Sequence, residues 1–176
     1  MSTPDLKEHD FTLVIDRPIT DDEIDALYDA GCDDATPEVE RNRTLLHFTR
    51  DAPALANAIA SAVLAVERAG LVSTGVDSND LVQRQEIAAR TGRTPESIRL
   101  LAAGERGPGG FPPAQHGFYS WVLVRAWFAL YDPAAVGSPT EDDLDYDRTI
   151  AAADHVVRAR ALMQGHAHGL EALLPA

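Results

Sequence analysis

The order of strand-like and helix-like segments predicts an α+β protein built from two folded parts. Apolar residues alternate or recur at helical spacing along residues 1–78, which we expect to form one α+β domain. Two short helices around a glycine are expected within residues 79–131. An acidic linker is expected over residues 132–147 and a last helix over residues 148–176.

The first two elements have clear local signals. Residues 11–15 (Phe-Thr-Leu-Val-Ile) are rich in β-forming side chains and predict a strand. Thr20 and Glu23 have the spacing of a capping box, so a helix is expected to begin there, followed by Gly31 as a C-terminal stop. The apolar face expected for this helix consists of Ile24, Leu27 and Tyr28.

The rest of the first domain is expected to be a hairpin, a helix and a strand. Residues 35–40 and 44–49 would pair, residues 53–69 would form a helix ended by Gly70, and residues 71–76 would close the sheet. This order is the ferredoxin-like βαββαβ arrangement, with both helices on one face of a four-stranded antiparallel sheet. Without the first hairpin strand, which contains Pro37, a three-stranded unit remains. The buried stripe expected on the long helix is Leu55, Ile59, Ala62, Val63 and Val66.

Residues 84–101 have the layout of a helix-turn-helix. Ala88 is small where two helices would approach, Gly92 tolerates the tight turn, and Thr94-Pro95 is a good cap and first turn for a second helix. Ile87, Ile98 and Leu101 would close a small core. An ordinary helical hairpin is the alternative.

The segment after the second helix predicts a wing. Residues 103–113 contain too many glycines and prolines for regular structure. Residues 118–121 could form the second strand of a short hairpin, or Ser120 could cap a helix. A winged layout follows if the hairpin forms, whereas residues 107–113 are otherwise a solvated linker. The bulky apolar side of the capped helix would be Val124, Trp127, Phe128 and Tyr131.

The last 45 residues carry an acidic cluster and then a helical pattern. We interpret the cluster as a solvated linker or a helix start rather than a cation site. The final helix does not repeat as strict heptads, and it could dock on the wing helix or on a second protomer. The cluster is Glu141, Asp142, Asp143, Asp145 and Asp147, and the apolar residues are Ile150, Val156, Val157, Leu162, Leu170 and Leu173.

Charge is distributed unevenly along the chain. The net charge is −13, which disfavours a general nucleic-acid coat or a membrane-surface protein. Residues 81–131 contain six arginines and three glutamates, a local +3, so the remainder carries −16. With a single cysteine, no membrane-spanning run and no signal-peptide pattern, a cytoplasmic protein is expected.

Candidates for catalysis or cofactor binding are poor, so we expect no enzyme, metal or cofactor. Cys32 precedes two aspartates, which would raise its pKa. His166 and His168 are two residues apart and would point to different sides of a helix. The glycines in residues 107–110 lack the Lys and Ser or Thr of a P-loop.

Several stretches together resemble a known class of DNA-binding protein. The sequence is similar to small actinobacterial helix-turn-helix proteins, with a winged module like that of excisionases and MerR-type regulators. The stretches are residues 86–99 (Glu-Ile-Ala-Ala-Arg-Thr-Gly-Arg-Thr-Pro-Glu-Ser-Ile-Arg), 104–112, 119–121 and 124–128.

The resemblance is best over residues 81–131, and residues 11–76 also look like the N-terminal part of such proteins. It implies DNA binding through the second helix. The wing segment, residues 113–118, departs from the pattern because it has no Lys or Arg. The residues implied to face the groove are Arg93, Thr94, Glu96, Ser97 and Arg99.

The sequence therefore predicts a transcriptional regulator that reads double-stranded DNA in the major groove. Arg99 would read a base, with Ser97 and Thr94 as shorter contacts. A homodimer is plausible, since one small module seldom binds tightly. The alternative is a protein-interaction module or an antitoxin-like protein that keeps the fold and binds a protein partner. The residues expected to contact the DNA backbone are Arg84, Arg93 and Arg106.

Overall fold

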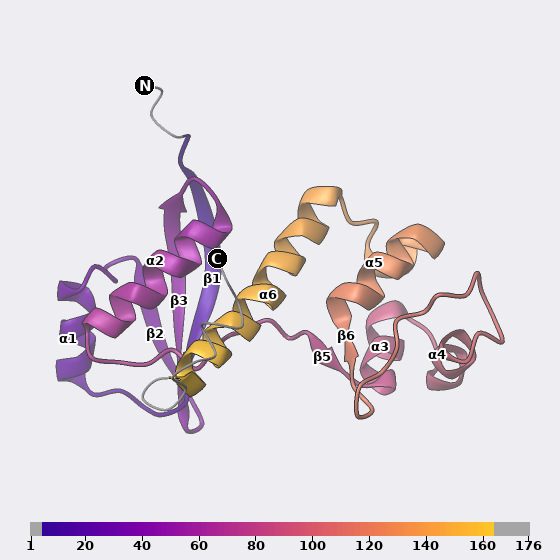
Figure 1. The fold of residues 1–176 in the computed structure, drawn as a ribbon, viewed down its shortest axis with the longest axis horizontal. Helices are drawn as coiled ribbons and strands as arrows, with labels where there is room; N and C mark the ends of the chain where they lie inside the picture. Colours follow the sequence, from indigo (N-terminus) through magenta and orange to yellow (C-terminus); the bar gives the residue numbers. More distant parts are fainter. Residues whose placement is uncertain (1–4, 164–176) are drawn as a thin grey trace. The chain divides into compact units, whose positions relative to one another are not determined.

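A computed structural model describes residues 5–163 of the chain (Figure 1). These residues form an α+β protein with a four-stranded antiparallel sheet and six α-helices. They divide into two compact units, which are treated separately below. The first unit contains residues 5–77 and 152–163, and the second contains residues 78–151.

The sheet of the first unit has the strand order β2-β3-β1-β4, with every neighbouring pair antiparallel. The register places Phe11 opposite Phe48 and Leu13 opposite Leu46. All four side chains are buried, and the two phenylalanine rings stack with centroids 5.2 Å apart. The strands are β1 (Lys7–Ile15), β2 (Ala35–Glu40), β3 (Arg43–Ala52) and β4 (Gly75–Val76).

The hairpin predicted in this unit is confirmed, so the three-stranded alternative is wrong. Arg41, with φ of 56°, lies in the turn between β2 and β3. Pro37 pairs opposite Leu46 on β2, which is an edge strand. A proline is tolerated there because one side of an edge strand makes no ladder hydrogen bonds.

Helix α1 (Asp21–Asp29) begins with the predicted capping box. The Glu23 backbone N–H donates to the Thr20 hydroxyl at 3.3 Å, and the Thr20 N–H donates to the Glu23 carboxylate at 2.9 Å. A hydrogen bond from Arg17 is the main cause that lowers the pKa of Glu23 to about 2. The predicted apolar face is wrong in part: Leu27 is buried, but Ile24 and Tyr28 are 37% and 67% exposed.

Helix α2 (Leu55–Arg68) packs on β1 and β3, and its predicted apolar stripe is confirmed as buried. The closing strand predicted over residues 71–76 is shorter than expected. The Leu71 N–H donates to the Val66 carbonyl at 3.1 Å, so the chain first completes the end of α2. Only the last two residues of the predicted strand, in β4, pair with β1.

The linker predicted to extend to residue 147 is wrong in its boundary, because α6 (Glu141–Met163) begins earlier. Thr140 and Asp143 form a reciprocal cap, with N–H to side-chain oxygen distances of 2.8 and 3.2 Å. Carboxylates in the first turn favour a helix start through its dipole. Residues 164–176, with the predicted contributions of Leu170 and Leu173, lie outside the described residues.

The part of α6 after residue 151 belongs to the first unit, and its Asp154 and Arg158 side chains lie next to Gly75 of β4. Asp154 is buried, and its carboxylate accepts the Val76 N–H at 2.8 Å. An ion pair of 2.6 Å joins Arg160 to Glu67 at the end of α2. This segment of α6 therefore satisfies a backbone donor at the end of the sheet.

Candidate nucleic-acid interface

The second unit begins with a two-stranded sheet and two short helices. Strand β5 pairs antiparallel with β6, which lies almost 40 residues later in the chain. Helices α3 and α4 follow β5, and α5 follows β6 directly. The elements are β5 (Leu81–Val82), α3 (Arg84–Thr91), α4 (Pro95–Ala102), β6 (Tyr119–Ser120), α5 (Trp121–Tyr131) and a 3-10 helix, η1 (Pro133–Val136).

The turn between α3 and α4 has the geometry that the sequence predicted. Gly92 ends α3 in the left-handed region, with φ of 65° and ψ of 24°. The Arg93 N–H then donates to the Ala88 carbonyl at 2.9 Å, which closes the helix end. Thr94 caps α4 by accepting the Ser97 N–H at 3.1 Å. The Thr94 hydroxyl, predicted as a DNA contact, therefore serves the helix start in this structure.

Gly92→Ala is expected to destabilise the second unit by about 1–2 kcal/mol, because a Cβ is disfavoured at positive φ. An added Cβ meets no atom within 4 Å, so the cost comes from the backbone alone. Urea unfolding followed by tryptophan fluorescence checks this result, since both tryptophans of the chain, Trp121 and Trp127, lie in this unit. Gly92→Asn is the control and should cost less, since asparagine tolerates this conformation. Equal losses for both variants would contradict the explanation.

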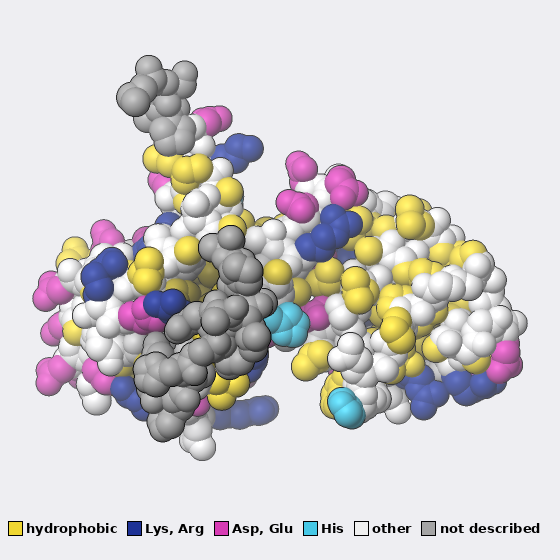
Figure 2. Space-filling view, viewed as in Figure 1, with side chains coloured by type: hydrophobic (Ala, Val, Ile, Leu, Met, Phe, Trp, Pro, Cys, Tyr) yellow, Lys and Arg dark blue, Asp and Glu magenta, His cyan; other side chains and the backbone are white. Residues whose placement is uncertain are grey.

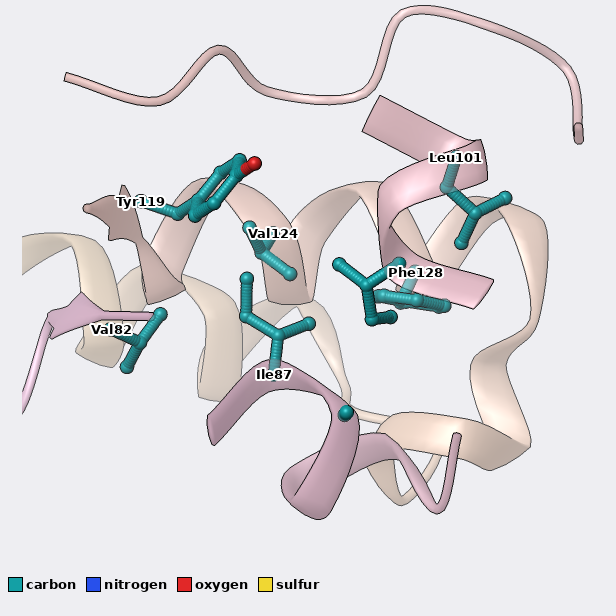
Figure 3. Close-up of a cluster of buried hydrophobic side chains, with 8 residues drawn as sticks. Val82, Ile87, Leu101, Tyr119, Val124 and Phe128 are labelled. Carbon is teal, nitrogen blue, oxygen red and sulfur yellow. The ribbon is translucent and has the colours of Figure 1, made fainter. Parts of the chain in front are cut away.

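A single core joins the sheet and three helices of this unit. Ile87 from α3, Ile98 and Leu101 from α4 and Phe128 from α5 are all less than 2% exposed. Figure 3 shows Ile87, Val124 and Phe128 pointing toward one another between the helices. The complete cluster is Val82, Ile87, Ala88, Ile98, Leu101, Tyr119, Val124 and Phe128.

Asp80 is a structural residue that the sequence reasoning missed. It is 7% exposed, and one carboxylate oxygen accepts from the Ser120 hydroxyl at 3.0 Å and from the Val122 N–H at 2.8 Å. Its carbonyl accepts the Trp121 N–H at 2.7 Å. This carboxylate therefore ties the segment before β5 to the start of α5.

The glycine-rich loop between α4 and β6 is anchored to the core, so the interpretation as a simple solvated linker is wrong. Phe111 packs edge-on against the rings of Trp127 and Phe128, with centroids 5.0 and 6.2 Å away. The Trp127 indole N–H donates to the Gly109 carbonyl at 2.9 Å. Fixed contacts on both sides of residue 110 hold the middle of the loop against α5.

The tip of this loop is a tight turn rather than a long hairpin. Gln115 and Phe118 exchange two backbone hydrogen bonds of 2.8 and 3.0 Å. His116 and Gly117 between them both have positive φ, 52° and 86°, as in a type I′ turn. Strand β6 pairs with β5 rather than with this turn. The capped-helix alternative is therefore confirmed, since Ser120 caps α5, whereas Tyr119 and Ser120 pair with β5 instead of forming a short hairpin with the preceding loop.

Arg99, the predicted base reader, lies on α4 between two carboxylates. Its guanidinium is 3.0 Å from Glu96 and 3.2 Å from Glu105. The hydrogen bond with Glu105, followed by that with Glu96, raises the pKa of Arg99. The side chain is 41% exposed. It is therefore accessible to solvent, but its positive charge is neutralised by the two carboxylates. We define Arg99, Glu96 and Glu105 as the arginine clamp.

Arg93 is turned toward α5 rather than away from the unit. It forms an ion pair of 2.5 Å with Asp132, and its guanidinium lies 5.3 Å from the Phe128 ring centroid and 5.8 Å from that of Tyr131. Only 22% of its side chain is exposed. Arg93, predicted to contact phosphate, therefore makes its contacts within the second unit, with Asp132, Phe128 and Tyr131.

Arg84 and Arg106 are exposed and have no ion pair with any of residues 5–163. Arg84 is the first residue of α3, and Arg106 lies in the loop after α4. Figure 2 shows basic side chains along the lower margin of the part of the chain that carries α3 and α4. Two uncompensated guanidinium groups therefore remain available to an anionic partner.

The positive charge predicted for residues 81–131 is partly neutralised by acidic residues that folding brings close to it. Arg93 pairs with Asp132 and Arg125 with Asp147, and both acids lie outside residues 81–131. The whole second unit has seven arginines and ten carboxylates, a net charge of −3. Any attraction to DNA therefore depends on the placement of a few arginines rather than on the total charge.

Cys32 is buried, and burial is the main cause that raises the pKa of its thiol. Among residues 5–163, no three His, Cys, Asp or Glu side chains are placed to hold a metal ion. His166 and His168 lie outside the described residues. In the same part of the chain, no helix has the length and apolar character needed to cross a membrane.

Comparison of the chain with models of known protein families, with curated proteins and with solved structures finds no match.

Proposed function

We propose that the protein is a sequence-specific DNA-binding regulator that reads the major groove with α4. The second unit would be a winged helix-turn-helix, in which α3 and α4 flank the turn and the loop after α4 takes the place of a wing. The first unit would be a ferredoxin-like domain. The strand order β2-β3-β1-β4 and the element order βαββαβ support this interpretation.

One observation carries the proposal: the start of α4 presents polar side chains outward while its other side is completely buried. Glu96 is exposed and Ser97 and Arg99 are half-exposed, whereas Ile98 and Leu101 are at most 1% exposed. A recognition helix needs this division, because its N-terminal residues contact base edges while its inner side holds the fold. Arg84 and Arg106 add two free positive charges for phosphate.

Selection of bound sequences from a random duplex pool tests this function directly. We expect a reproducible motif, since a major-groove helix discriminates base pairs by their hydrogen-bonding edges. If the protein binds as a two-fold dimer, the motif should contain half-sites about 34–36 Å apart. Failure to enrich any sequence at low salt would contradict DNA reading.

Arg99→Ala is expected to weaken binding to the selected duplex by about 1–3 kcal/mol and to relax the preference at one base pair. Fluorescence anisotropy with a labelled duplex measures this loss. Arg43→Ala is a matched control, because Arg43 is also exposed and also pairs with a glutamate three residues earlier, Glu40, at 2.6 Å. If the two variants bind the selected duplex equally well, α4 is not the reading helix.

A protein-interaction module is the second candidate, in line with the antitoxin-like alternative. The net charge of −3 on the second unit and the compensation of Arg93, Arg99 and Arg125 by carboxylates favour it. Such a module would bind a protein partner and show no preference among duplexes. The sequence selection therefore separates the two candidates.

A further inference from the structure

The arginine clamp is built into the end of α4 by the backbone. Gly104, with φ of 70°, reverses the chain after the helix. The Glu105 N–H then donates to the Leu100 carbonyl at 2.9 Å, and the Gly104 N–H donates to the Leu101 carbonyl at 3.1 Å. These bonds bring Glu105 back beside Arg99, which lies three residues after Glu96 on α4.

The three charged groups of the clamp sum to −1, although the surface is proposed to bind a polyanion. Both carboxylates are well exposed, with 65% of the Glu96 side chain and 55% of the Glu105 side chain accessible. A lone arginine would attract any phosphate. With two carboxylates within 3.2 Å of Arg99, the clamp as a whole repels phosphate.

We propose that Glu96 and Glu105 are positioning residues that make the DNA-binding surface selective, an inference that rests on the proposed function. They remove the attraction of Arg99 to phosphate and hold its guanidinium in one orientation. A guanine edge can still bind an arginine held in this way, because its two acceptors, O6 and N7, match the two N–H groups of the guanidinium fork. A single phosphate gains less, because its attraction depends mainly on net charge. The preferred ligand is therefore duplex DNA with a guanine facing Arg99.

Glu105→Gln tests the inference, because glutamine keeps the shape and an acceptor oxygen but removes the charge. We expect affinity for a scrambled duplex to rise about 3- to 10-fold at low salt, as one repulsive charge is lost. The dependence of log affinity on log salt should become steeper by about 1. Affinity for the selected duplex should rise less, so the ratio of specific to non-specific binding should fall.

The control is Glu40→Gln, which removes a carboxylate with the same relation to an arginine, Arg43, in the first unit. It should leave both affinities and the salt dependence unchanged. Thermal unfolding of each variant should match that of the original protein, since these side chains are exposed.

Three outcomes are informative. A fall in the specificity ratio and a steeper salt dependence for Glu105→Gln alone support the proposal. If Arg99→Ala weakens binding to the selected duplex while Glu105→Gln changes neither quantity, the inference is overturned and the proposed function stands. If no sequence is selected and Arg99→Ala has no effect, both are overturned.

Discussion

Phe128→Ala is expected to lower the free energy of unfolding of the second unit by about 3–5 kcal/mol. Phe128 has no exposed surface and is part of the cluster that joins β5, α3, α4, β6 and α5. Its ring meets the rings of Phe111 and Trp127 edge-on, with centroids 6.2 and 5.1 Å away. The alanine would leave a cavity among these groups and remove support for the Arg93 guanidinium.

Tryptophan fluorescence during urea unfolding measures this loss in the second unit alone, because both tryptophans lie there. Leu130→Ala is the matched control on the same helix, since Leu130 is 91% exposed and its truncation should change stability by less than about 0.5 kcal/mol. Hydrogen exchange of the amides in β1 and β3 should be unaffected by either variant. Similar shifts for Phe128→Ala and Leu130→Ala would contradict the proposed core.

Asp80→Ala is expected to cost about 1–3 kcal/mol, because it leaves a half-buried backbone donor and a hydroxyl without the buried carboxylate that accepts from them. The carboxylate receives the Val122 N–H and the Ser120 hydroxyl, so its loss should loosen both β6 and the first turn of α5. The surface proposed to bind DNA should lose order as well, since β6 pairs with β5 directly before α3.

Two variants keep this second test specific. Asp80→Asn retains an acceptor oxygen and should be less harmful than Asp80→Ala. Asp142→Ala removes an exposed carboxylate from the first turn of α6 and should cost less than about 1 kcal/mol. Fluorescence-detected unfolding ranks the three variants. A loss for Asp80→Ala no larger than that for Asp142→Ala would show that the hydrogen bonds to Asp80 contribute little.

Local signals in the sequence predicted much of the secondary structure. Capping by Thr20 and by Thr94 and the turn at Gly92 depend on residues three or four apart, so the chain order alone reveals them. The buried stripe of α2 follows the helical period in the same way. Boundaries were less accurate, as the early start of α6 shows.

The sequence predicts the candidate site less well, because whether an arginine is exposed and unpaired depends on acidic residues far away in the chain. Arg93 pairs with Asp132, 39 residues away, and Arg125 with Asp147, 22 residues away. A charge count over a window cannot include acids that folding brings in from outside it. Among residues 5–163, Arg84 and Arg106 have no ion-pair partner. Arg99 pairs with Glu96 and Glu105, which lie only three and six residues away in the chain.

The sequence by itself determined the α+β class, the capped helices and the turn at Gly92, because these features arise from hydrogen bonds and side-chain periodicity over a few residues. The tertiary structure alone decided that β6 pairs with β5, that Asp80 joins them to α5, and that Arg93 faces inward. These contacts join segments about 40 residues apart. Their free energies depend on which groups become neighbours after the core has closed, and no local pattern specifies that.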